Sequence, residues 1–109
     1  MAGEAGASDG DANPVPRRKL DVVSPIIEAR WRDQVRVAGE VRSVRIVSQH
    51  DSPTLELVLV DATGALSIVF LGRRQIAGVD VGTRLEASGT VGVFRNRLAM
   101  LNPTYKLLG

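Results

Sequence analysis

The spacing of apolar residues predicts a chain built of β-strands from about residue 33 onward. In DQVRVAGEV, residues 33–41, valines and a glycine alternate with polar or small residues, a period of two that is typical of a half-buried strand. After Val41 the apolar positions move to Val44 and Ile46, so the alternation slips by one residue. A strand glycine, here Gly39, followed by such a slip indicates a bend or a bulge. We therefore expect a long and curved first strand.

Two apolar runs that flank a short break predict the next two strands. The stretch LELVLVDATGALSIVFLG, residues 55–72, carries apolar residues on either side of Asp61–Gly64, and those four residues have turn composition. The interpretation is an antiparallel hairpin in which alternate residues point inward. The inward positions are Leu55, Leu57 and Leu59 in one strand and Leu66, Ile68 and Phe70 in the other.

The C-terminal part predicts two more strands after a short link. The segment GRRQIAGVDVG, residues 72–82, has room for about one helical turn before its glycines interrupt it. A fourth strand follows over residues 85–93, where apolar or small residues recur at alternate positions. A tight FRNR connection, residues 94–97, leads to a fifth strand that contains Leu98 and Met100.

The N-terminal part is predicted to divide into a leader and a short helix. Residues 1–19 offer almost nothing to bury, so we interpret them as a flexible leader and assign residues 20–109 to the domain. In SPIIEAR, Ser24 is suited to an N-cap, Pro25 to the first helical position and Glu28 to the first turn. These residues predict a short helix before the first strand.

Five strands in roughly 75 residues favour a small Greek-key barrel over a sandwich, which normally needs about seven strands. The curved first strand and the short helical link between strands three and four add to this prediction. The fold class we predict is therefore all-β, a five-stranded Greek-key OB-fold barrel. In that fold the loops between strands one and two and between strands four and five flank the binding face.

Composition excludes several classes of site. There is no cysteine, and a single histidine, His50, cannot anchor a zinc ion alone, so no metal or cofactor is expected. Ser48, His50 and Asp51 are neighbours in one polar loop and do not converge from separate places, so we do not expect an enzyme. No apolar run approaches the roughly 18 residues of a membrane span, and no secretory signal pattern is present. We expect a cytoplasmic protein with no membrane partner.

The charge distribution points to an anionic partner for the domain. Three of the 12 acidic residues lie before the first basic residue, Arg17, so residues 17–109 carry all 14 basic residues against 9 acidic ones. Twelve of the basic residues are arginine, which suits bidentate contacts to phosphate. GC-rich coding also favours arginine, so the composition leaves both explanations open.

The order of several turn and strand-end residues resembles a known family. The matching residues are Asp61, Gly64, Phe70, Gly78, Gly82, Gly89, Asn102, Pro103 and Tyr105. Over about residues 33–107 the chain resembles bacterial OB-fold proteins of the nucleic-acid-binding, anticodon-binding-like class, and it is similar to the wedge domain of the RecG helicase. The resemblance implies a nucleic-acid ligand. The loop SQHDSP, residues 48–53, lacks the aromatic residue that stacks at a DNA fork in the wedge, and no G-x-x-x-x-G-K-[ST] motif is present, so a fork-remodelling role is not implied.

Phosphate contacts need cations along a groove, and base contacts need flat side chains. The candidate nucleic-acid-binding residues are Arg36, Arg42, Arg45, His50, Arg73, Arg74, Phe94, Arg95 and Arg97. Each arginine could equally be a solubilising surface residue, and Phe94 could pack over the barrel rim. The expected partner is single-stranded DNA or RNA, or a junction, bound electrostatically and with little sequence preference. Trp31 could either pin the N-terminal helix or stay open for stacking.

A protein-interaction role is the alternative. The outward positions of strands two and three include Val58, Val60 and Val69, which would form an exposed apolar patch. Such a patch could be covered by the N-terminal segment, by a second copy of the chain or by another protein.

Overall fold

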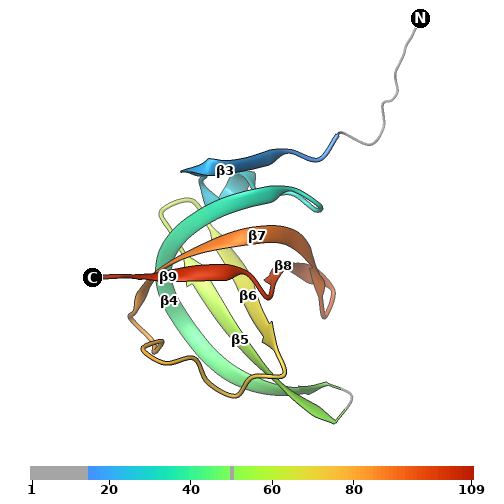
Figure 1. Ribbon diagram of the computed structural model, residues 1–109, viewed down its shortest axis with the longest axis vertical. Coiled ribbons are helices and arrows are strands. Elements are labelled where there is room, and N and C mark those ends of the chain that lie inside the picture. The colour runs from blue at the N-terminus through green and yellow to red at the C-terminus, as the bar shows by residue number, and fades with distance from the viewer. Residues whose placement is uncertain (1–14, 50) are drawn as a thin grey trace, which may run out of the picture.

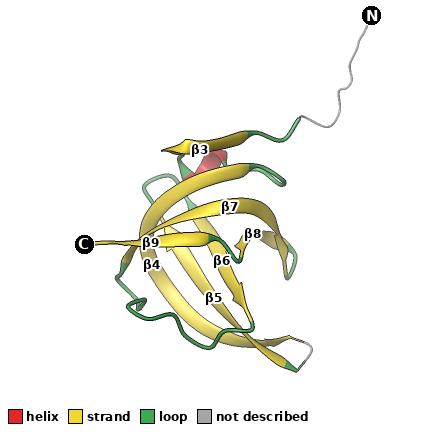
Figure 2. Ribbon diagram, viewed as in Figure 1, coloured by secondary structure: helices red, strands yellow, loops and turns green. Residues whose placement is uncertain are grey.

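The computed structural model describes residues 15–49 and 51–109 and consists almost entirely of β-strands (Figures 1 and 2). The elements in chain order are β3 (Arg18–Val23), the 3-10 helix η1 (Ile26–Glu28), β4 (Gln34–Gln49), β5 (Ser52–Val60), β6 (Ala65–Leu71), β7 (Arg84–Phe94), β8 (Arg97–Leu101) and β9 (Thr104–Leu108). None of the described residues belongs to a helix long and apolar enough to cross a membrane.

The strands form an OB-fold-like ring. β4 pairs with β5, β5 with β6, β6 with β8, β8 with β7, and β7 returns to β4. The pair β6–β8 is parallel and the other four pairs of the ring are antiparallel. β3 and β9 extend the sheet at its two ends, so among the described residues it contains seven strands in place of the five that we predicted.

The long first strand of the prediction is β4, and its bend is confirmed. Its first half, residues 34–40, pairs with β7, and its second half pairs with β5 (Figure 1). The register with β5 shifts between Val41 and Ser43, which leaves Arg42 as the extra residue of a bulge. At Gly39 a Cβ atom would lie 2.3 Å from the carbonyl oxygen of Val60, so only glycine allows the two strands to approach this closely.

The inward positions form the hydrophobic core, as the alternation predicts. Leu57, Leu59 and Ile68 have no exposed surface, and Phe70 is buried with them. The ring of Tyr105 on β9 packs edge-on against Phe70 with 5.6 Å between centroids. Ile76 and Val79, from the link between β6 and β7, close one side of this core.

The link between β6 and β7 corrects the predicted helical turn. All of residues 72–83 are described and none is helical. Gly78 and Gly82 have φ angles of +81° and +95°, in the left-handed region that interrupts a right-handed helix. The predicted fifth strand corresponds to β8, and Asn102, with φ +47°, separates it from the additional strand β9.

The N-terminal prediction is wrong in two details. The helix is a single 3-10 turn capped by Pro25, and Ser24 is buried with its backbone N–H donating to Arg36 O at 2.7 Å. The first backbone N–H groups of η1 donate to other side chains, Ile26 N–H to Asp61 at 2.9 Å and Ile27 N–H to Thr63 at 3.1 Å, so Ser24 is not needed as the cap. β3 begins at Arg18, within the last residues of the predicted leader, and residues 1–14 of that leader lie outside the described residues.

Candidate nucleic-acid interface

The β7–β8 hairpin presents two of the predicted arginines on a tight turn. Arg95 and Asn96 form the two-residue connection, and both have positive φ angles, +51° and +68°. Two positive φ angles characterise the type I′ turn, whose twist matches that of the flanking strands. Arg97 pairs with Phe94 across the hairpin, so its side chain lies on the outer face of the sheet. Both arginines are exposed, and neither has an ion-pair partner within the described residues.

Arg45 lies on the outer face but its charge is compensated. Its Nε donates to Glu56 Oε1 at 2.9 Å, and Nη2 lies 2.9 Å from the same oxygen. The Glu56 side chain is only 1% exposed, and its other carboxylate oxygen accepts a hydrogen bond from Ser67 Oγ at 3.1 Å. This pair was not among our predictions. The antiparallel register, in which residue 45 faces residue 56, was the signal that could have predicted this pair.

Arg36 is not part of the same surface. Its Nε lies 3.5 Å from Glu86 Oε2 on β7, and Arg36 faces Ser88 in the β4–β7 register. That pair lies in the half of β4 that does not contact β5. The predicted alignment of Arg36 with Arg42 and Arg45 therefore fails, because β4 bends between residues 36 and 45.

The remaining predicted cations lie at two separate places, the bulge of β4 and the link that follows β6. Arg42 is exposed at the bulge of β4, and Arg73 and Arg74 are exposed in the link after β6. Gly72 N–H donates to Pro53 O at 2.9 Å, which fixes the start of this link beside the beginning of β5. His50, also predicted for the site, lies outside the described residues.

Phe94 is buried, contrary to the stacking role that we considered. The residue is 7% exposed and packs with Val69 and Ala99 in a second apolar cluster, with Leu101 at its side. The alternative of rim packing is therefore correct. This cluster also removes the apolar patch expected on the outer face, because Val69 is completely buried and Val58 and Val60 are half-buried.

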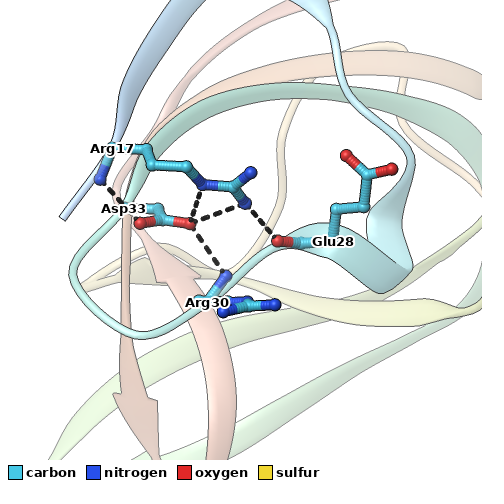
Figure 3. Close-up of polar contacts among 4 residues, drawn as sticks. All are labelled: Arg17, Glu28, Arg30 and Asp33. Carbon is cyan, nitrogen blue, oxygen red and sulfur yellow. Dashed lines mark hydrogen bonds and ion pairs between the residues drawn. The ribbon is translucent and has the colours of Figure 1, made fainter. Parts of the chain in front are cut away.

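A buried carboxylate fixes the chain that leads into β4 (Figure 3). Asp33 accepts hydrogen bonds from the Arg17 backbone at 2.8 Å, from the Arg17 guanidinium at 3.1 Å and from the Arg30 backbone at 3.2 Å. Burial by itself raises the pKa of Asp33, but the hydrogen bonds and charge of Arg17, with the bond from Arg30, outweigh it, so the pKa lies below its ordinary value. Arg17 also donates to Glu28 O at 2.6 Å, which ties η1 to the same cluster.

Asp61 anchors the other side of η1. Its carboxylate accepts hydrogen bonds from the backbone N–H groups of Ile26, Thr63 and Gly64 at 2.9, 2.7 and 3.0 Å. Burial raises the pKa of Asp61, but the hydrogen bonds from the Thr63 hydroxyl and from these backbone groups lower it by more, so the pKa lies below its ordinary value. The Asp-x-x-Gly turn thus holds the N-terminal segment against the β5–β6 hairpin.

Trp31 is the most exposed of the aromatic residues that the structure describes. Its side chain is among the exposed apolar groups at 60%, and the Arg32 guanidinium carbon lies 5.5 Å from the ring centroid. Sequence reasoning left its role open and did not include it in the site. Its two arginine neighbours in ARWRD were the available signal, since arginine is mostly exposed.

Comparisons with known proteins agree with this architecture. The model of the family described as OB-fold nucleic acid binding domain matches residues 35–108. The hypothetical protein ygiW from E. coli is similar in structure, with a TM-score of 0.58 and 17% identity over 88% of this chain and 100% of that one. The OB domain of MM0293 from Methanosarcina mazei gives a TM-score of 0.60 and 14% identity over 87% and 86%. At these identities the two likenesses show the fold. None of the curated proteins matches this chain significantly.

Proposed function

This chain belongs to the family of OB-fold nucleic acid binding domains, and from that premise we propose that it binds single-stranded DNA or RNA, or the single-stranded part of a junction. Binding is mainly electrostatic and has little sequence preference. The function is binding and not catalysis.

The observation that carries the proposal is the exposed pair Arg95 and Arg97 on the β7–β8 hairpin. In OB folds this hairpin and the loop between the first two strands of the ring flank the binding face. Both cations are available because no described carboxylate neutralises them. Their guanidinium groups can each take a phosphate in bidentate geometry, which positions a strand without reading its sequence.

The second edge of the proposed face is the β4–β5 hairpin with the adjacent link. Arg73 and Arg74 follow Gly72, whose hydrogen bond to Pro53 fixes the link beside this hairpin. Arg45 contributes less, because Glu56 already compensates its charge. A strand that runs between the two hairpins would cross the outer face of β5 and β6.

The burial of Val69 argues against the alternative of a protein-interaction patch. An exposed apolar surface is the feature that marks such a contact, and Phe94 covers the centre of this one. We therefore retain the nucleic-acid proposal alone.

A salt series tests the proposal. The anisotropy of labelled single-stranded DNA and RNA is measured with increasing protein concentration at several salt concentrations. The logarithm of the association constant should fall linearly with the logarithm of salt concentration, with a slope of about −0.7 for each phosphate contact. Replacing Arg97 by Gln should make the slope shallower. The matched control is Arg84→Gln, which removes the same charge at the opposite end of β7 and should leave the slope unchanged. Absence of binding even at low salt would refute the proposal.

A further inference from the structure

A second cationic surface lies outside the residues matched by the family model, and this one also carries an exposed aromatic ring. It consists of the turn at Arg30–Arg32 and the first residues of β3. Trp31 is largely exposed, and Arg32 lies against its ring. Arg18 and Lys19 pair with Gln34 and Val35, just after this turn, so their backbone lies alongside it. Trp31 is the one aromatic residue of the sequence that has a basic residue directly before and directly after it.

The turn that carries Trp31 is held firmly on both sides. Asp33 N–H donates to Arg30 O at 3.0 Å, and the Asp33 carboxylate accepts from Arg30 and Arg17. Arg32 N–H donates to Val91 O at 2.7 Å, and Arg32 has a φ angle of +75°. A backbone turn held in this way loses little conformational freedom when a ligand stacks on the ring that it carries, which favours binding.

The cations of this surface are available to a ligand. Arg18, Lys19, Arg30 and Arg32 are all exposed, and among the described residues none of them forms an ion pair. Arg17 is not counted among these cations, because it forms an ion pair with Asp33. Arg18 and Lys19 are neighbours on β3, so their side chains point to opposite faces of the strand. The surface therefore offers a flat apolar group with positive charges beside it, the combination that single-stranded nucleic acid requires.

This surface lies close to the hairpin of the proposed function. The contact of Arg32 with Val91 places the turn beside β7, and Arg95 follows four residues later. At a strand rise of about 3.3 Å per residue, that separation is roughly 13 Å. One bound strand can span this distance, since OB folds occupy about 4–16 nucleotides. The exposed residues Val93 and Leu98 lie between the turn that carries Trp31 and the turn that carries Arg95.

We infer that Trp31 is a base-stacking platform for single-stranded nucleic acid, which extends the bound strand beyond the β7–β8 hairpin onto the N-terminal segment. Arg32 covers one face of the indole and contacts a phosphate, and a base stacks on the other face. This inference rests on the proposed function and names a further part of the same binding surface.

Trp31 is the single tryptophan of the chain, so its own fluorescence reports on the inference. The full chain is titrated with unlabelled oligo-dT and oligo-U while tryptophan emission is recorded, and in parallel with labelled oligonucleotides while anisotropy is recorded. We expect quenching that saturates at the same protein to nucleotide ratio as the anisotropy. An anisotropy increase without quenching would overturn the platform and leave the proposed function intact. No anisotropy increase at low salt would overturn both.

Variants separate stacking from charge. Trp31→Ala should weaken binding about 5- to 150-fold, the range expected for one stacked base, with no change in salt slope. Arg32→Asn, which tolerates the positive φ angle, should make the slope shallower by about 0.7. Val81→Ala, another exposed apolar residue, is the matched control and should bind as the parent does. Equal affinity of Trp31→Ala and the parent, with both folded by circular dichroism, would refute the inference.

Discussion

The guanidinium of Arg45 lies 2.9 Å from Glu56 Oε1, so a half-exposed cation on β4 covers a carboxylate on β5 that has almost no contact with solvent. The pair lies beyond the bulge of β4, where pairing with β7 has ended and β5 is the one described partner. It therefore connects the projecting half of β4 to the rest of the sheet through side chains as well as backbone.

Removing one member of this pair should destabilise the protein. Arg45→Met leaves Glu56 buried with Ser67 as its remaining partner, and we expect the free energy of unfolding to fall by about 1–3 kcal/mol. Replacing both residues by methionine should cost less than the single change, because no unpaired charge remains. Urea denaturation measures both values. Arg42→Met, at the exposed bulge, is the control and should change stability little.

Phe94 should prove structural and not a ligand contact. Phe94→Ala removes a buried ring from the cluster with Val69 and Ala99, so we expect a loss of about 3–5 kcal/mol in unfolding free energy. Phe94→Leu keeps most of the volume and should retain both the fold and oligonucleotide affinity. If Phe94→Leu were stable but bound nucleic acid much more weakly, the ring would be acting in stacking after all. Thermal denaturation and anisotropy titrations distinguish these outcomes.

The strands of the ring could be predicted because their signal is local. Alternating residues such as Leu57 and Leu59 become buried once a strand has formed, and the slip after Val41 marks the bulge within the same short stretch. The link at residues 72–83 was harder to predict. Its apolar residues Ile76 and Val79 are spaced like one helical turn, but they are buried by contact with the ring while two glycines adopt positive φ angles.

The candidate site was only partly predictable, because it depends on which distant residues face one another. Arg45 is less available to a ligand because it forms an ion pair with Glu56, and Phe94 is unavailable because it packs against Val69. Both partners lie on other strands. The exposure of Arg95 and Arg97 was easier to predict, since residues in and beside a two-residue hairpin turn are exposed in most folds. The role of Trp31 depends on Asp33 and Arg17, whose contact spans 16 residues of sequence.

Asp33 and Asp61 should make stability sensitive to acid. Both have folded-state pKa values below the ordinary value of 3.8, so the unfolded chain binds more protons than the folded one in this range. Their contribution is complete well above pH 3.8 and is lost as the pH falls through 3.8 toward the lower folded pKa values. Urea denaturation between pH 6 and about pH 3 should show this decline. Asp61→Asn should flatten it, and an unchanged slope in that variant would contradict the assignment.

The β7–β8 turn offers a matched pair of substitutions that separates shape from charge. Arg95 and Asn96 both adopt positive φ angles, where glycine carries no steric cost, so Arg95→Gly and Asn96→Gly should both leave the turn intact. Asn96→Ala, in contrast, removes the short polar side chain that allows asparagine to adopt the left-handed region, and should cost about 1 kcal/mol in unfolding free energy. Because only Arg95→Gly removes a cation, it alone should weaken oligonucleotide binding and make the salt dependence shallower by about 0.7. Equal weakening by Arg95→Gly and Asn96→Gly would show that turn conformation, and not the charge of Arg95, controls binding.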